Sequence, residues 1–113
     1  MSRKIAIASV CNDGIIIVVN LEDEKFLAFH DIHPQAPVHV LIIPKQHYAN
    51  LNELQDAQLA GELLITVATI AKQLGVAENG YRTVINCNND GGQTVGHLHI
   101  HLLAGRQLTW PAG

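Results

Sequence analysis

One stretch of seven residues constrains this chain more than any other: His97-Leu98-His99-Ile100-His101-Leu102-Leu103 alternates histidine with aliphatic residues. Because successive side chains of a β-strand point to opposite faces, the stretch predicts a strand with three imidazoles on one face and aliphatic side chains on the other. Neighbouring imidazoles would stand about 6.5–7 Å apart, twice the rise per residue. The pattern therefore predicts a row of imidazoles on a rigid element backed by a packed core.

Three interpretations of this histidine row stay open from the residues alone. It could be a solvated polar face, or a metal site, since His-x-His pairs on strands can ligate zinc. However, no carboxylate accompanies His97, His99 and His101 on that face. The third interpretation is nucleophilic catalysis at phosphorus, because a neutral imidazole is a good nucleophile near pH 7. A second, protonated imidazole could hold phosphate oxygens or the leaving group.

The residues directly before the histidine row favour the phosphorus interpretation. Asp90-Gly91-Gly92-Gln93-Thr94 begins as a turn, and its two glycines let backbone amides approach an anion closely. The side chains of Gln93 and Thr94 add hydrogen-bond donors at the start of the strand. Negative charge developing on a phosphoryl group would meet donors already in position.

The rest of the chain predicts one α+β domain spanning residues 1–113. Apolar residues at intervals of three and four predict a long helix over Leu59–Leu74, with Asp56 as its N-cap or first-turn acid and Gly75 at its end. One central helix among antiparallel hairpins predicts an α+β fold, not a doubly wound sheet. The five expected strands are Ile15–Val19, Phe26–Phe29, Val38–Ile43, Tyr81–Cys87 and Val95–Leu103.

Composition excludes several classes of partner. The net charge is −3 and no cluster of Lys and Arg appears, which argues against binding a nucleic acid polymer. No apolar run approaches the roughly 20 residues that span a bilayer, so no membrane association is expected. The two cysteines, Cys11 and Cys87, lack the spacing of a disulfide framework. They are expected to be reduced thiols in a cytoplasmic protein.

The histidine row resembles the signature of the histidine triad (HIT) family, and other segments resemble its Hint branch, over about residues 21–113. Histidine at the third triad position, His101, distinguishes it from the uridylyltransferase branch, which carries Gln there. The resemblance implies a HIT-like fold, an antiparallel five-stranded sheet with one long helix, and a homodimer that joins two sheets. The other matching segments are Phe29–Ile32, Pro34–His39, Ile43–Lys45, Gly91–Thr94 and Gly105–Pro111.

The resemblance also implies a purine nucleoside phosphoramidase that hydrolyses the P–N bond of adenosine 5′-phosphoramidates, without a cofactor. His99 would attack the α-phosphorus and form a nucleotidyl-histidine intermediate, which water would hydrolyse. His101 would contact phosphate and leaving group, and His39 would support His101 from the neighbouring strand. His97 would help orient His99, partly through its backbone carbonyl. The alternatives are a nucleotide-binding module with little turnover and a metal-dependent hydrolase.

Further residues match the family's nucleotide-binding positions. Asp31 and Ile32 match those that hold the ribose and base, and a carboxylate suits two ribose hydroxyls. Trp110 resembles a C-terminal residue that lies near the partner subunit's site. The positions that match phosphate and leaving-group contacts are Asn86, Gly92, Gln93 and Thr94, together with His99 and His101.

Residues 1–20 depart from the family pattern, in which a short helix usually helps wall the base pocket. The segment contains no proline, and Cys11 stands alone where members often carry Cys-x-x-Cys. In zinc-binding members that cysteine pair joins two histidines, which correspond to His47 and His97. Because the pair is missing, no structural zinc is expected. We hypothesise that the altered segment leaves the phosphate chemistry intact and changes the base pocket.

Overall fold

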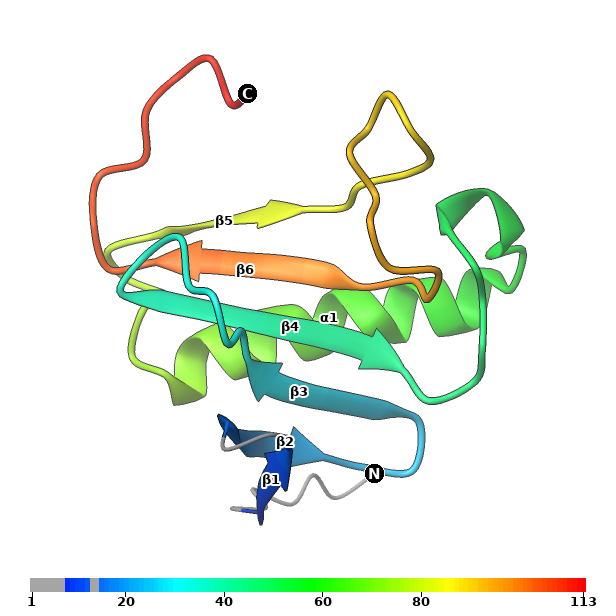
Figure 1. Ribbon diagram of the computed structural model, residues 1–113, viewed down its shortest axis with the longest axis horizontal. Coiled ribbons are helices and arrows are strands. Elements are labelled where there is room, and N and C mark those ends of the chain that lie inside the picture. Colours follow the sequence, from blue (N-terminus) through cyan, green and yellow to red (C-terminus); the bar gives the residue numbers. More distant parts are fainter. Residues whose placement is uncertain (1–7, 13–14) are drawn as a thin grey trace.

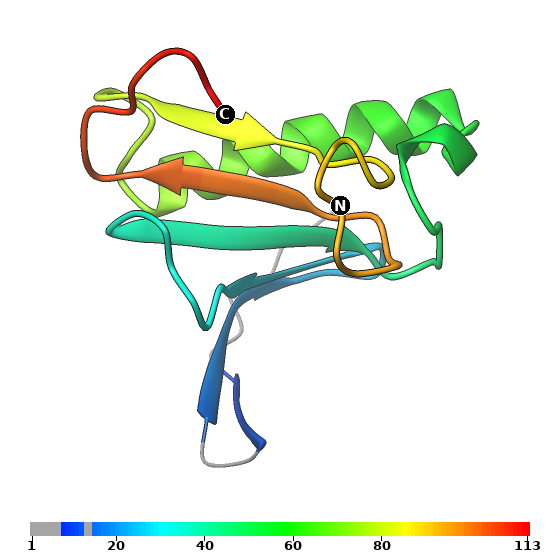
Figure 2. The same cartoon turned by 45° about the horizontal axis from the view of Figure 1, so that its top comes forward.

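A computed structural model describes residues 8–12 and 15–113, with side chains from residue 21 onward (Figure 1). Within this part of the chain, antiparallel strands form one sheet in the order β1-β2-β3-β4-β6-β5. A long helix, α1, covers one face of the sheet (Figures 1 and 2). The elements are β1 (Ala8–Asn12), β2 (Ile15–Glu22), β3 (Phe26–His30), β4 (Val38–Pro44), the 3-10 turn Leu51–Glu53, α1 (Ala57–Gln73), β5 (Tyr81–Val84) and β6 (Ile100–Ala104).

The α+β architecture expected from the sequence is confirmed. All five expected strands are present, and β1 adds a sixth at one edge of the described sheet. The sequence placed the last strand too early, at Val95, because β6 begins at Ile100. Ile42 of β4 pairs with Ile100, so Leu98 would lie opposite Pro44, which has no N–H to donate. The amide of Leu98 instead donates to the carbonyl of Tyr48 at 2.7 Å.

The strand expected at Tyr81–Cys87 is also shorter in the structure. β5 ends at Val84, whose pairing partner is His101 near the start of β6. Because β6 begins only one residue before His101, β5 has almost no further strand residues to pair with beyond Val84. The chain then enters a loop in which Asn88 adopts a positive φ of 59°. Cys87 lies in this loop as a free thiol, as expected, whereas the side chain of Cys11 lies outside the described residues.

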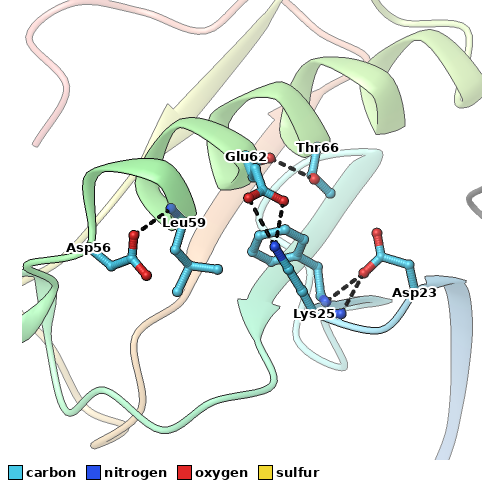
Figure 3. Close-up of polar contacts among 7 residues, drawn as sticks. Asp23, Lys25, Asp56, Leu59, Glu62 and Thr66 are labelled. Carbon is cyan, nitrogen blue, oxygen red and sulfur yellow. Dashed lines mark hydrogen bonds and ion pairs between the residues drawn. The ribbon is translucent and has the colours of Figure 1, made fainter. Parts of the chain in front are cut away.

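Helix α1 begins and ends close to the positions that the sequence predicts. The Asp56 carboxylate accepts a hydrogen bond from the Leu59 amide at 3.1 Å and caps the first turn (Figure 3). The helix ends before Gly75, whose φ of 75° suits a glycine C-cap. At 17 residues, neither it nor any other described helix meets the length and hydropathy needed to cross a membrane. The buried face of α1 comprises Leu59, Leu63, Thr66, Val67, Ile70 and Ala71.

Polar contacts fix α1 to the hairpin of β2 and β3. Lys25, in the turn of this hairpin, forms an ion pair of 3.0 Å with Glu62 of α1 (Figure 3). The Asp23 carboxylate accepts hydrogen bonds from the Lys25 and Phe26 amides at 2.8 Å and holds the turn. The helix therefore covers the core face of the sheet.

Side-chain alternation leaves a second set of residues on the opposite face. Val40 and Ile42 of β4 are fully buried in the core that α1 covers. His39, Leu41 and Ile43 alternate with them and so point to the other side of the sheet. The candidate functional residues gather on this side, which α1 does not cover.

Candidate active site

An open cavity of about 540 Å³ lies on the sheet face opposite α1. This volume falls within the usual range for small-molecule sites, about 300–1,000 Å³. Phe29, Leu41 and Ile43 give it an apolar surface, and all three histidines of the row line it. The remaining lining residues are His30, Asp31, Ile32, His33, Asn86, Gly92, Thr94 and Val95.

The alternation predicted for the histidine row is confirmed, although only His101 lies within β6. Leu98, Ile100 and Leu102 are at most 1% exposed and pack in the core. His97, His99 and His101 are half-buried and line the cavity. The extended alternation continues through residues 97–99 without strand pairing. The imidazoles therefore share one face, as the sequence predicts.

The ring of His99 is held by a main-chain carbonyl. Its Nδ1 atom lies 2.7 Å from the carbonyl oxygen of His97. A carbonyl oxygen only accepts, so Nδ1 must carry the proton of this hydrogen bond. In a neutral ring, Nε2 is then unprotonated and carries an available lone pair. The local main chain thus selects the tautomer in which His99 Nε2 is nucleophilic.

His39 and His101 form a hydrogen-bonded pair across β4 and β6. The Gln35 amide donates to His39 Nδ1 at 3.0 Å, which leaves Nδ1 without a proton. His39 Nε2 therefore carries the proton of the neutral ring and donates it to His101 Nδ1 at 2.9 Å. His101 then carries its own proton on Nε2. The site combines an unprotonated nitrogen on His99 with a protonated nitrogen on His101.

Burial keeps this pair neutral. Burial lowers the pKa of His39, which is 5% exposed, and the Asp31 carboxylate partly opposes this effect. Burial also lowers the pKa of His101, with further lowering from His99 and His39 and an opposing contribution from Asp31. Both rings are therefore neutral at pH 7, as the tautomer assignment requires.

A group comprising Asp31, His39 and His101 has the spacing of a metal site, with its ligand atoms within 4.8 Å of one another. The hydrogen bond from the Gln35 amide argues against that use. A metal on His39 Nε2 would require the ring proton to move to Nδ1, where it would face the Gln35 N–H. The donor set therefore suits a hydrogen-bonded chain better than a metal ion.

A second histidine pair lies at the mouth of the site. His97 Nε2 donates to the Pro44 carbonyl at 2.9 Å, which leaves its Nδ1 free to accept. His47 Nδ1 lies 3.2 Å from that atom and can donate to it. The exposed His47 and the Pro44 carbonyl fix the orientation of the half-buried His97 ring, and the main chain of His97 holds His99.

The loop before the histidine row is closely packed. The Asn86 side-chain amide donates to the Gly91 carbonyl at 2.6 Å. A Cβ at Gly91 would lie 2.5 Å from the Cys87 carbonyl oxygen, so only glycine fits there. Gln93 donates to the Ala49 and Val95 carbonyls and does not line the cavity. In this structure its amide fastens the loop, whereas Gly92 and Thr94 face the cavity.

Of the three residues matched to the base, the ribose and the partner's site, two line the cavity and one does not. Asp31 and Ile32 both line the cavity, and Ile32 is 44% exposed. The Asp31 carboxylate accepts a hydrogen bond from the His33 amide at 2.8 Å, and its other oxygen lies 3.5 Å from His39 Nε2. Trp110 is 84% exposed and is not among the lining residues.

Several lining residues were not anticipated from the sequence. Leu41 and Ile43 alternate with core residues on the same strand as His39, so strand periodicity could have identified them. Of the main-chain groups that fix the tautomers, the His97 carbonyl was implied by the family resemblance, whereas the amide of Gln35 has no signal in the sequence. The other unanticipated lining residues are Phe29, His30, His33 and Val95.

Comparisons with known proteins agree with this geometry. Residues 15–108 match the HIT domain family. An uncharacterized HIT-like protein of Synechococcus elongatus is 61% identical over 94 residues, covering 81% of this chain and 82% of the relative. A 14 kDa zinc-binding protein of Zea mays is 50% identical over 96 residues, covering 81% of this chain and 74% of the relative.

Solved structures share the fold. A HIT family hydrolase from Legionella pneumophila superposes with a TM-score of 0.83 at 50% identity, covering 88% of this chain and 90% of that one. A histidine triad nucleotide-binding protein from Candida albicans superposes with a TM-score of 0.72 at 33% identity, covering 88% of this chain and 78% of that one.

Proposed function

Because this chain belongs to the HIT domain family, we propose that it is a purine nucleoside phosphoramidase acting on adenosine 5′-phosphoramidates. The observation that carries the proposal is the pairing of tautomers in one cavity. His99 has an unprotonated Nε2 and His101 a protonated one, so a nucleophile and a hydrogen-bond donor for phosphate lie beside each other. Their ring centroids are 5.0 Å apart.

The first step forms a covalent intermediate. His99 Nε2 donates its lone pair to the α-phosphorus, and the bond between phosphorus and the amine nitrogen breaks. The amine nitrogen takes a proton from solvent and leaves as the neutral amine, while the neutral His101 ring keeps its Nε2 proton and donates it as a hydrogen bond to a phosphate oxygen. The proton that His99 keeps on Nδ1 remains hydrogen-bonded to the His97 carbonyl, which stabilises the positive charge developing on the ring.

The second step returns the enzyme to its starting state. Water attacks the phosphorus and loses one proton to solvent, while the His101 Nε2–H stays hydrogen-bonded to a phosphate oxygen. The bond between phosphorus and His99 Nε2 breaks, the electron pair returns to Nε2, and adenosine monophosphate leaves. His39 donates to His101 Nδ1 throughout and so keeps the proton of His101 on the nitrogen that faces the cavity. No cofactor enters either step.

The cavity provides surfaces for the nucleotide. The base lies against Ile32 and the apolar residues of the lining, and the Asp31 carboxylate accepts from the ribose hydroxyls. Phosphate oxygens lie beside Gly92, Thr94 and Asn86, which line the cavity. Gln93 contributes by holding the loop that carries these residues.

We propose that the working unit is a cytoplasmic homodimer. Leu64 and Ile65 of α1 are 60% and 63% exposed, and β5 is an edge strand of the described sheet. Exposed apolar side chains and an edge strand both suit association with a second copy. Trp110, 84% exposed in one chain, would then lie near the partner's site.

The proposal is tested by turnover of adenosine 5′-phosphoramidate in excess chelator, with guanosine phosphoramidate for comparison. We expect hydrolysis of the P–N bond that chelator does not inhibit and that His99→Gly abolishes while nucleotide affinity is kept. Nucleotide binding without turnover would favour a binding module, and loss of activity in chelator would favour a metal-dependent hydrolase. Strong selectivity between the adenosine and guanosine substrates would show that the base pocket is intact. Similar turnover of both would support the hypothesis that the altered segment of residues 1–20 changes that pocket.

A further inference from the structure

The hydrogen bond that sets the tautomer of His39 comes from outside the cavity. Its donor is the main-chain amide of Gln35, in the loop between β3 and β4. Without this donor, His39 could carry its proton on either ring nitrogen. The proton on His101 Nε2 depends on this choice, because His101 Nδ1 accepts only while His39 Nε2 donates. The position of one amide therefore controls whether His101 presents a hydrogen-bond donor to the cavity.

The segment directly after β6 holds that loop. The Arg106 guanidinium donates to the Gln35 carbonyl at 3.1 Å. A Cβ at Gly105 would lie 2.8 Å from the Pro37 Cβ, so the two segments pack closely. Gly105 has a φ of 96°, which favours glycine there. The loop and the end of β6 meet at the same end of the sheet (Figures 1 and 2).

Hydrogen bonds within residues 31–39 also hold the loop that carries Gln35. The Gln35 side chain donates to the His33 carbonyl at 3.0 Å, and the His33 amide donates to Asp31. The Asp31 amide in turn donates to the His39 carbonyl at 2.9 Å. These contacts close the loop onto β4, and Arg106 hydrogen-bonds the loop to the segment that follows β6, the strand that carries His101.

We propose that Arg106 is a positioning residue: by holding the Gln35 carbonyl, it directs the Gln35 amide at His39 Nδ1 and so keeps the proton of His101 on Nε2. Arg106 does not line the cavity, and its guanidinium donates to the Gln35 and Gln107 carbonyls, so its effect on the site passes through the loop. We call this series of contacts, from Arg106 through Gln35 and His39 to His101, the relay. Because Arg106 and His101 lie on one continuous segment, movement of that segment would displace both ends of the relay.

The direct test is the tautomer of His39 in the ligand-free protein, read from imidazole ¹⁵N chemical shifts by NMR. The wild type should show a single Nε2–H tautomer for His39. Arg106→Ala should give a mixture with the Nδ1–H form, and Arg106→Lys, which keeps one donor, should restore part of the wild-type signal. Gln107→Ala, a neighbouring exposed residue outside the relay, is the matched control and should not change the spectrum.

A second variant removes the donor itself. Replacing Gln35 by its α-hydroxy acid turns the amide into an ester and deletes the N–H, whereas Gln35→Ala keeps it. The ester should drive His39 to the Nδ1–H tautomer, and Gln35→Ala should leave the wild-type tautomer. If Arg106→Ala and the ester both keep a pure Nε2–H tautomer, the proposal is wrong, because nothing would then depend on the relay.

The activity measurements rest on the proposed phosphoramidase function, whereas the NMR measurements do not. Arg106→Ala should lower kcat by about 3- to 10-fold, the range expected for one hydrogen bond, with little change in KM. A larger rise in KM with an unchanged tautomer would mean that Arg106 acts on the substrate's charge, which contradicts the relay. A tautomer change in a protein without turnover would support the relay and overturn only the proposed reaction.

Discussion

The Nδ1 atom of His99 lies 2.7 Å from the main-chain carbonyl oxygen of His97, and this contact orients the ring. Main-chain carbonyls do not change when a side chain is replaced. The contact therefore separates the two histidines by role: one acts through its ring and the other through its backbone. Histidine occurs at both positions, yet the structure assigns only His99 a freely available ring nitrogen.

Replacing these two histidines should have very different effects. His99→Ala removes the proposed nucleophile and should lower kcat by about 10³-fold or more. His97→Ala keeps the carbonyl and loses only the ring contacts to Pro44 and His47, so kcat should fall by less than about tenfold. Steady-state kinetics with one phosphoramidate compares them. Losses of similar size would show that the His97 ring itself takes part.

The role of His101 as a hydrogen-bond donor to phosphate predicts a loss that does not depend on the leaving group. His101→Ala removes the Nε2–H and should lower kcat by about 10- to 100-fold for a phosphoramidate of an alkyl amine, the range for a hydrogen bond to a charged group. The deficit should be of similar size for an adenosine monophosphate ester of an acidic phenol, which leaves without a proton. A deficit that disappears for the phenol would mean that His101 assists departure of the amine itself.

The pH dependence follows from the two buried histidines. Burial lowers the pKa of His39 and of His101 below the ordinary value of 6.5. The unfolded chain therefore binds more protons just below pH 6.5, so the stability contribution of these rings is complete above that pH and declines on acidification. We expect kcat/KM to be level above about pH 6.5 and to decline in acid, as protonation of His39 breaks its bond from Gln35.

Asp31 provides a specific test of this dependence. Its charge raises the pKa of both histidines, so Asp31→Asn should move the acid limb of the kcat/KM profile to lower pH. Asparagine keeps an oxygen for the His33 amide. Asp56→Asn, at the helix cap, is the control and should leave the limb in place, because asparagine caps as well as aspartate. Movement to higher pH in Asp31→Asn would contradict the assignment.

Substitutions at two isoleucines of α1 should distinguish an effect on folding from an effect on dimer formation. Ile70 is 1% exposed, and Ile70→Ala should lower the free energy of unfolding by about 2–5 kcal/mol at any protein concentration. Ile65 is 63% exposed, so Ile65→Asp should leave the folded chain intact and convert the proposed dimer to monomer. Urea denaturation and sedimentation measure the two effects. An unchanged dimer in Ile65→Asp would place the interface elsewhere.

Much of the site could be predicted from the sequence because strand periodicity acts locally. Alternation put Leu98, Ile100 and Leu102 in the core and the histidines in the cavity, even where strand pairing stops. The position where β6 begins could not be read from its own residues. It depends on Pro44, which meets the segment only through the register of the folded sheet.

The tautomers could not be predicted from the sequence either. They are set by the amide of Gln35 and the carbonyl of His97, groups that every non-proline residue carries. Only the fold brings these particular groups to ring nitrogens. The same applies to Gln93, whose side chain was expected at the phosphate and instead holds Ala49 and Val95 carbonyls.

Covalent catalysis by His99 is tested by mass spectrometry of the protein quenched during turnover of adenosine 5′-phosphoramidate. We expect an adenylyl adduct on His99, absent in His99→Gly and accumulating in a variant that slows hydrolysis of the intermediate. Turnover with no adduct on His99, or with the adduct on another residue, would contradict it.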